Sequence, residues 1–213
     1  MIKITPILLL ALLAGCATAP APMPVDPARF EAVLKTGFES KGMATLARLQ
    51  QDQTQEYCSE VHASAAAGNQ ARLAAIEKAN LAAVKWPSDG KYLGDWKQGE
   101  KIAQSGRGMT WSDKADAENG GNCYNCHQID KEEISYGTIG PSLWHYGKLR
   151  GVTDPNSKES AEIVKYTWGK IWNSKAYNAC SNMPRAGHMG ILNEGQVRHI
   201  MALLLDPKSP VNQ

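Results

Sequence analysis

Two cysteines and a histidine fall within five consecutive residues, Cys123-Tyr-Asn-Cys126-His127. Thiols three residues apart lie on one face of a helical turn, so both can add to the vinyl groups of one haem. The histidine that follows can then present its imidazole to the iron. Because C-x-x-C-H is the attachment motif of c-type haem, we expect one covalent haem c on Cys123 and Cys126, with His127 as the proximal iron ligand.

Two other chemistries use a C-x-x-C pair. A structural zinc site needs four ligands, and no second C-x-x-C supplies the rest. A thioredoxin-like dithiol is expected beside a βαβ pattern, and no such pattern is visible near Cys123. The sequence therefore favours haem over both alternatives.

A haem used for electron transfer usually has both axial positions filled by the protein. Met183 lies in Asn182-Met-Pro-Arg-Ala-Gly187, where proline restricts the backbone and glycine permits a tight reversal. Such a loop can hold a sulfur at a fixed distance from iron, which favours Met183. The other side chains after the motif that could take this position are His145, Cys180, His188, Met189 and His199.

The N-terminus has the pattern of an export signal. Lys3 precedes an apolar run, Ile4 to Leu13, that is too short to span a bilayer as a helix. Leu13-Ala-Gly-Cys16 resembles a bacterial lipobox, which would make residues 1–15 a lipoprotein-type signal peptide and Cys16 the lipidated N-terminus. The alternative is cleavage after Ala19, which the following proline disfavours. Both readings place the protein in the periplasm, lipid-anchored to a membrane in the first.

The chain contains 5 cysteines. With Cys16 assigned to the lipobox and two to the haem motif, Cys58 and Cys180 remain. A leftover pair in an oxidising compartment most often forms a disulfide, so we expect this bond. A free buried thiol and Cys180 as a haem ligand remain open alternatives.

The remaining pattern predicts an all-α fold. Residues 16–27 form a proline-rich tether. Residues 28–88 form a helical extension rich in Ala, Glu, Lys, Gln and Leu, with helix starts predicted at Asp26-Pro27 and at Asn69. The cluster Trp86-Pro-Ser-Asp-Gly90 marks a boundary, after which residues 89–213 form the haem domain.

Two helices should enclose that domain. One is predicted over residues 96–104, ending at Ser105-Gly106. The other begins at Asn193-Glu-Gly-Gln196, which has the form of a capping box, and stops before Pro207. Its apolar residues recur with helical spacing and predict a buried face: Val197, Ile200, Met201, Leu204 and Leu205.

Charge and motifs exclude several functions. The formal net charge is +2, so there is no electrostatic case for nucleic-acid binding. The sequence contains no Ser/His/Asp set, no G-x-x-x-x-G-K-S/T run and no H-E-x-x-H. A chain that can hold an electron but has no catalytic set of its own is typical of an electron carrier.

Several segments together resemble a class I cytochrome c, and more closely the SoxX family. The SoxX proteins are the monohaem subunits of the SoxAX cytochromes of bacterial thiosulfate oxidation. The resemblance covers roughly residues 90 to 213 and not the extension. Besides C-x-x-C-H, it is carried by Gly120–Asn122, Gly140–Leu143, Tyr146–Gly151, Met183–Gly187 and Leu204–Asn212.

The resemblance implies roles for particular residues. Met183 would be the distal ligand, opposite His127. The carbonyl of Pro141 would accept a hydrogen bond from the ring nitrogen of His127 that faces away from iron. Arg185 would approach a haem propionate. The residues expected to line the haem are Leu143, Tyr146, Trp168 and Trp172, although packing in the core without haem contact is nearly as strong a reading for the two tryptophans.

The resemblance also implies a function and partners. The chain would be the non-catalytic, electron-accepting subunit of an L-cysteine S-thiosulfotransferase, paired with a SoxA-type haem subunit. It would take electrons from the conjugation of thiosulfate to a SoxYZ carrier and pass them to a small cytochrome c. A free-standing electron shuttle is the main alternative, and a haem sensor or small enzyme with an open iron site is a third.

Overall fold

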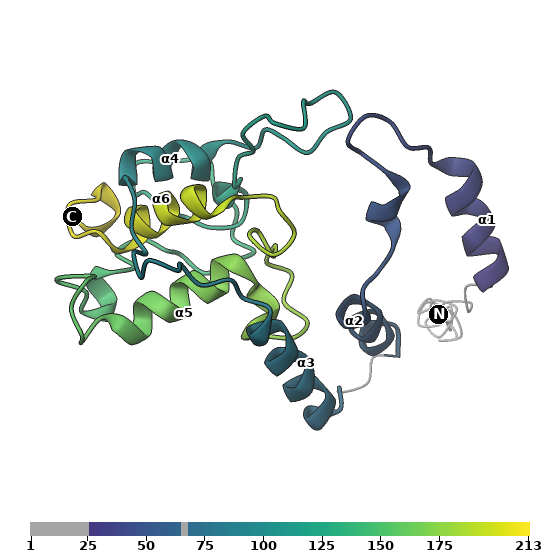
Figure 1. Ribbon diagram of the computed structural model, residues 1–213, viewed down its shortest axis with the longest axis horizontal. Helices are drawn as coiled ribbons and strands as arrows, with labels where there is room; N and C mark the ends of the chain where they lie inside the picture. Colours follow the sequence, from purple (N-terminus) through teal and green to yellow (C-terminus); the bar gives the residue numbers. More distant parts are fainter. Residues whose placement is uncertain (1–25, 65–67) are drawn as a thin grey trace, which may run out of the picture. The chain divides into compact units, whose positions relative to one another are not determined.

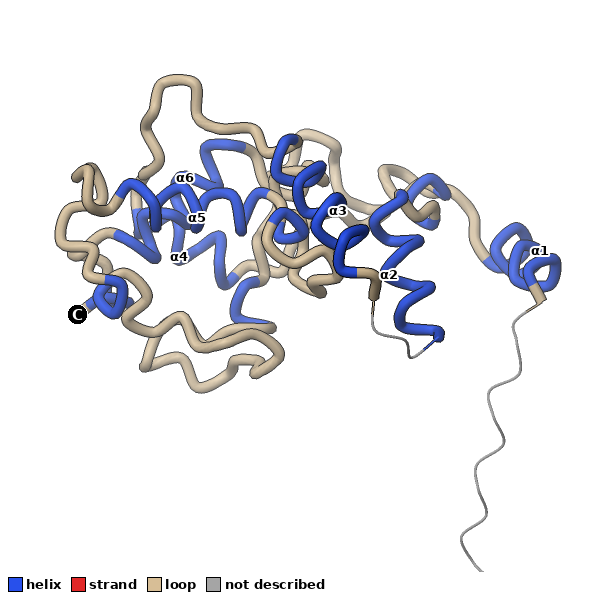
Figure 2. The backbone as a smooth tube through the Cα atoms, turned by 90° about the horizontal axis from the view of Figure 1, so that it is seen from below, coloured by secondary structure: helices blue, strands red, loops and turns tan. Residues whose placement is uncertain are grey.

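The computed structural model describes residues 26–64 and 68–213. Over these residues the chain is helical, and the only extended pairing is an isolated bridge between Lys41 and Ala44 (Figure 2). The all-α prediction is therefore confirmed. No helix in this part of the chain is long and apolar enough to cross a membrane. The predicted signal peptide, Cys16 and the tether up to residue 25 lie outside the described residues.

The chain divides into two compact units, with the boundary between Glu39 and Ser40. The first unit contains α1 (Pro27–Gly37), where Asp26 accepts a hydrogen bond from the Ala28 amide and proline occupies the first turn, as the sequence predicts. The sequence placed a boundary at 88/89 instead. Residues 40–88 belong with the second unit because covalent and polar contacts tie them to residues late in the chain.

Three helices form the centre of the second unit: α4 (Trp96–Gln104), α5 (Ala161–Trp172) and α6 (Glu194–Leu205). Helix α6 packs against both α4 and α5 (Figure 1). It begins with the predicted capping box, in which Asn193 and Gln196 bond reciprocally. The predicted apolar face of α6 is buried in the core.

Close contact between α4 and α6 depends on small residues. A Cβ added at Gly99 of α4 would lie 2.2 Å from the His199 carbonyl oxygen, so glycine lets the two helices approach. At the start of α4, the His199 imidazole Nδ1 accepts a hydrogen bond from the Asp95 amide at 2.9 Å. The start of α4 therefore lies over the His199 imidazole.

Short 3-10 helices complete the second unit: η1 (Leu46–Leu49), η2 (Cys123–Asn125), η3 (Lys148–Arg150), η4 (Ser174–Ala176) and η5 (Pro210–Asn212). The last of these closes the chain onto the segment that follows Pro141. The Asn212 side-chain oxygen accepts from the amides of Gly147 and Lys148 at 2.9 and 3.1 Å. The closing segment therefore fixes the start of η3.

The extension contributes α2 (Gln53–Ser64) and α3 (Gln70–Ala82). Asn69 caps α3 as predicted, accepting from the Arg72 amide at 3.0 Å. Asn80, buried on α3, accepts at its side-chain oxygen from the Asn173 amide group at 3.0 Å. The Trp168 indole donates to the Lys85 carbonyl at 2.9 Å. These bonds fix α3 to the C-terminal end of α5.

Candidate functional site

The C-x-x-C-H residues occupy one tight turn. The Cys123 carbonyl accepts hydrogen bonds from the amides of Cys126 and His127, at 3.1 and 3.0 Å. Asn122, just before η2, has a φ of 50°, a left-handed conformation that asparagine tolerates better than most residues. Gly121 donates from its amide to the Ile102 carbonyl at 2.8 Å. The end of α4 thus positions the turn that carries both thiols.

The orientation of His127 is set by a backbone carbonyl. Its Nδ1 lies 2.7 Å from the Pro141 oxygen. A carbonyl can only accept, so Nδ1 carries the proton and donates. A neutral imidazole has one N–H, which leaves the lone pair on Nε2 available. This is the arrangement of a metal-binding histidine whose second nitrogen is held by the protein.

Gly140 leaves space for the His127 imidazole because it has no side chain. A Cβ added at this position would lie 2.2 Å from Cε1 and 2.5 Å from Nδ1 of His127. The Gly140 amide also donates to the Cys126 carbonyl at 2.8 Å. The segment before Pro141 therefore lies directly against the motif, and only glycine leaves room for the ring there.

The electrostatics of the motif do not suit a redox dithiol. Burial raises the pKa of the Cys123 thiol to about 12. Dithiol oxidoreductases need a thiolate, and they lower the pKa of the attacking cysteine to obtain it. Neither Cys123 nor Cys126 is in a disulfide. Among the described residues no three His, Cys, Asp or Glu side chains gather as a metal-binding group.

Met183 lies half-buried against the core, near the end of α5. Its backbone is held on both sides, because the Ser174 hydroxyl donates to its carbonyl at 2.5 Å and its amide donates to the Ser181 hydroxyl at 3.2 Å. Other half-buried apolar side chains border the same core, from the motif, from the segment after Pro141 and from the methionine loop: Cys123, Leu143 and Ala186.

Most of the other candidate ligands have different surroundings. Nε2 of His145 lies 2.6 Å from the Gln213 carbonyl oxygen. His199 accepts a hydrogen bond at the start of α4. Cys180 is joined to Cys58, with Cα atoms 5.4 Å apart, which is the bond that the cysteine count predicts. Met189 and His188 are exposed, so Met183 is the candidate closest to the core.

The residues expected to line a haem are mainly in the core. Trp168 is fully buried and stacks on Trp172, with ring centroids 5.8 Å apart. The Tyr146 hydroxyl bonds the Thr167 hydroxyl at 2.9 Å. The Trp168 indole nitrogen donates to the Lys85 carbonyl. The Trp172 indole nitrogen, in contrast, is buried without a hydrogen-bond partner among the described residues. A buried donor of this kind costs free energy until a partner is supplied.

Arg185 was expected beside a propionate. In the structure its buried guanidinium lies 2.6 Å from the Asp52 carboxylate. Sequence reasoning did not identify Asp52, although Asp52-Gln-Thr-Gln55 has the form of a capping box and marks the start of α2. Burial opposes ionisation of Asp52, but a hydrogen bond from the Gln55 amide and the charge of Arg185 outweigh it and lower its pKa.

Sequence reasoning also missed a polar contact between the C-x-x-C-H motif and α4, which joins Tyr124 to Glu100. The Tyr124 hydroxyl donates to Glu100 of α4 at 2.9 Å. The other carboxylate oxygen of Glu100 is buried with no partner in the described structure. Burial raises the pKa of Glu100 despite the hydrogen bond from Tyr124. A single glutamate in a polar helix gives no sequence signal for this environment.

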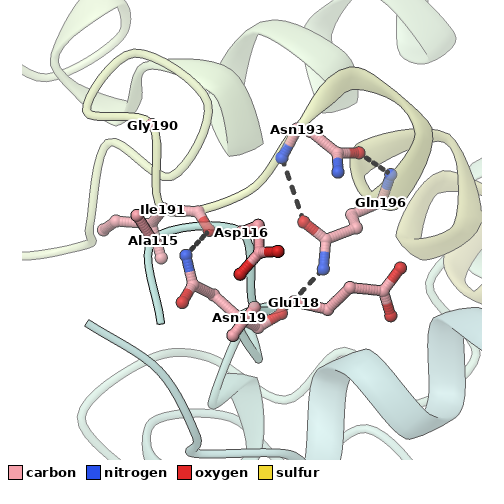
Figure 3. Close-up of a pocket in the computed structure, with 9 residues that line it drawn as sticks. Ala115, Asp116, Glu118, Asn119, Gly190, Ile191, Asn193 and Gln196 are labelled. Atoms are coloured by element: carbon pink, nitrogen blue, oxygen red, sulfur yellow. Dashed lines mark hydrogen bonds between the residues drawn. The ribbon is translucent and has the colours of Figure 1, made fainter. Parts of the chain in front are cut away.

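A cavity of about 220 Å³ lies between residues 115–119 and residues 190–196. Its polar groups bond mainly to one another (Figure 3). Gln196 donates to the Asn119 carbonyl at 2.7 Å, and the Asn119 side chain donates to the Ile191 carbonyl at 2.9 Å. The lining includes neither a motif cysteine nor Met183. The cavity therefore lies between residues 115–119 and the segment that leads into α6, and it is not part of the motif.

The geometry defines a class: an all-α protein in which a C-x-x-C-H turn and a methionine loop border one helical core. No family model matches the chain. An uncharacterized lipoprotein of Aquifex aeolicus (strain VF5) is 36% identical over 164 residues, which cover 76% of this chain and 73% of that protein. The chain belongs to the same family as this lipoprotein.

Proposed function

We propose that this chain is a c-type cytochrome with a class I-like haem domain, and that it serves as the electron-accepting, SoxX-type subunit of a SoxAX L-cysteine S-thiosulfotransferase. The observation that carries the haem assignment is the bond from His127 Nδ1 to Pro141. It leaves Nε2 free to bind a metal, next to two cysteines on the same turn.

The surrounding residues fit a haem. Cys123 and Cys126 would hold it covalently, with His127 and Met183 as axial ligands. Half-buried apolar side chains border the core at the motif and the methionine loop, and the Trp172 indole offers a buried donor without a partner among the described residues. When bound, haem with His/Met ligation supplies a one-electron centre of raised potential.

The chain's own residues would orient the ligands and exclude water. Pro141 and Gly140 hold the His127 ring, and Ser174 and Ser181 hold the backbone of Met183. No group for proton transfer or nucleophilic attack is needed, because the thiosulfate chemistry would belong to the SoxA-type partner. Conjugation to the SoxYZ cysteine is a two-electron oxidation, so this chain would pass electrons on singly to a small cytochrome c.

Exposed apolar residues favour a permanent partner over a free shuttle. Ile134 and Ile139, in the segment that follows the motif, are 95% and 81% exposed. Large apolar groups near a redox site are typical of surfaces that another protein covers. The partner that we propose is the SoxA-type subunit.

The location that we propose is the periplasm, with a lipid anchor on Cys16. The relative from Aquifex is named a lipoprotein, and the lipobox-like Leu13-Ala-Gly-Cys16 of this chain would supply the same modification. Mass spectrometry of the mature N-terminus tests the anchor: a diacylglyceryl cysteine supports it, and cleavage after Ala19 contradicts it.

Two measurements test the function. The purified chain, run on a denaturing gel, should retain haem, and a Cys123→Ser, Cys126→Ser variant should not. The isolated chain should be reducible but unable to conjugate thiosulfate to a SoxYZ-type carrier, and a SoxA-type partner should restore turnover. Activity of the chain alone would refute the division of labour, and failure to associate would favour the free shuttle.

A further inference from the structure

The loop that carries Met183 has little regular structure of its own. It runs between η4 and α6, and the bonds from Ser174 and Ser181 fix only the backbone around the methionine. An iron ligand must be held to within a fraction of an ångström, and loops achieve this only when other elements support them. The contacts that support this loop are therefore of functional interest.

The helical extension grips the loop on both sides of Met183. On one side, Cys58 of α2 is bonded to Cys180, with Cα atoms 5.4 Å apart. Next to it, the Ala179 amide donates to the Glu77 carboxylate of α3 at 3.1 Å. On the other side, Arg185 pairs with Asp52 at 2.6 Å.

Asp52 performs two tasks with its two oxygens. Oδ1 accepts from the Gln55 amide at 2.9 Å and so caps α2. Oδ2 pairs with Arg185, whose side chain is only 5% exposed. A buried guanidinium depends strongly on its carboxylate. The start of α2 and the end of the methionine loop are therefore held by one side chain.

The extension is itself anchored. Asn173 donates to the carbonyl and to the side-chain oxygen of Asn80, at 3.2 and 3.0 Å, and Trp168 donates to the Lys85 carbonyl. These bonds fix α3 to the same end of α5 from which the loop departs. The three contacts with the loop, made by Cys58, Glu77 and Asp52, therefore come from a segment that is itself held against α5.

We propose that residues 40–64 and 68–84 are a clamp that positions Met183, with Asp52, Cys58 and Glu77 as its positioning residues. The proposal rests on the proposed function in one respect, namely that Met183 is the distal ligand. It gives a role to the part of the chain that the SoxX resemblance does not cover. Without the clamp, Met183 would leave the iron more often and external ligands would compete with it.

The test uses a pair of matched variants of the full-length protein. Asp52→Asn keeps an oxygen to cap α2, since asparagine is a good capping residue, but it removes the charge that pairs with Arg185. Asp89→Asn is the control. It removes the carboxylate that bonds Arg198 at 3.0 and 2.8 Å, on α6 and outside the clamp. The double variant Cys58→Ser, Cys180→Ser removes the covalent contact.

Two readouts follow, and the first is independent of haem. Backbone hydrogen exchange over residues 178–187 should accelerate about fivefold or more in Asp52→Asn and in the double variant, and should stay at the wild-type rate in Asp89→Asn. Second, the same two variants should bind cyanide to ferric iron about tenfold more tightly and lose intensity in the near-infrared sulfur-to-iron band.

The outcomes separate the two proposals. Unchanged exchange and unchanged cyanide affinity in both clamp variants would overturn the clamp. Faster exchange in a chain that carries no covalent haem would support the clamp as a loop-positioning device and refute the proposed function. Faster exchange in haem-bearing variants that retain wild-type cyanide affinity and near-infrared band would show that Met183 is not positioned by the clamp, and so overturn the inference.

Discussion

Replacing both Cys58 and Cys180 by serine should remove a large part of the stability of the second unit. The bond joins residues separated by 122 positions. In the chain-entropy model a crosslink that closes so long a loop reduces the entropy of the unfolded chain by an amount equivalent to about 5 kcal/mol at 25 °C. This figure exceeds the net contribution of any single hydrogen bond described above.

The measurement is equilibrium unfolding in urea, followed by far-UV circular dichroism. With a slope of about 2 kcal/mol per molar urea, the double variant should unfold at a urea concentration lower by about 2.5 M. The wild type treated with a reductant that leaves thioethers intact should move to the same midpoint. The double variant should be insensitive to that reductant, which provides the matched control.

A loss of less than about 1 kcal/mol in the free energy of unfolding would refute the reasoning. It would mean that the unfolded chain gains little conformational freedom when the bond is absent. A wild type that unfolds at the same urea concentration with and without reductant would also refute it, since the bond would then not have formed. Mass spectrometry of non-reduced peptides confirms the bonded state of each sample.

Three further outcomes are expected. Gly140→Ala should cost about 1–3 kcal/mol of unfolding free energy, because its Cβ would lie 2.2 Å from the His127 ring, whereas Gly37→Ala, with nothing within 4 Å, should be almost neutral. Asn80→Ala should cost about 1–3 kcal/mol by leaving buried Asn173 without its side-chain acceptor. Burial raises the pKa of Glu100 above its ordinary 4.5, so protonated Glu100 favours folding, and this contribution is lost as pH rises through the folded-state pKa. Glu100→Gln should therefore lose less stability than the wild type as pH rises from 4.5 to neutral, and a pH-independent difference between the two would contradict this.

Helix boundaries could be predicted well because their signals are local. Asp26-Pro27, Asn69 and the capping box at Asn193 each place a polar acceptor before the first turn, and the structure begins α1, α3 and α6 at these points. The placement of Pro141 beside His127 also agrees with expectation. In that case the expectation came from resemblance and not from local pattern.

Contacts between distant segments could not be predicted in the same way. Asp52 with Arg185, and Asn80 with Asn173, join residues more than a hundred and more than ninety positions apart, and neither pair has a periodicity that identifies its partner. The predicted boundary at 88/89 rests on a proline and glycine cluster, and such a cluster marks the end of a helix without specifying which segments pack together. The contact between Cys58 and Cys180 was the exception, because these two cysteines remain after the lipobox and haem-motif cysteines are assigned, and two remaining cysteines predict a disulfide.

The position of the Cys58–Cys180 bond has a consequence for how the protein is made. Cys123 and Cys126 lie between these two residues in the sequence, so the covalent loop closed by the disulfide contains the C-x-x-C-H turn. Four thiols allow three pairings. Two of them join each motif cysteine to Cys58 or Cys180, and the third combines the native bond with a bond between Cys123 and Cys126. If Cys123 and Cys126 carry haem as we propose, modification of these thiols before oxidation would leave only the native partners, Cys58 and Cys180. On the proposed function, a bacterium that exports this chain but does not attach haem to Cys123 and Cys126 should accumulate protein with incorrect disulfides.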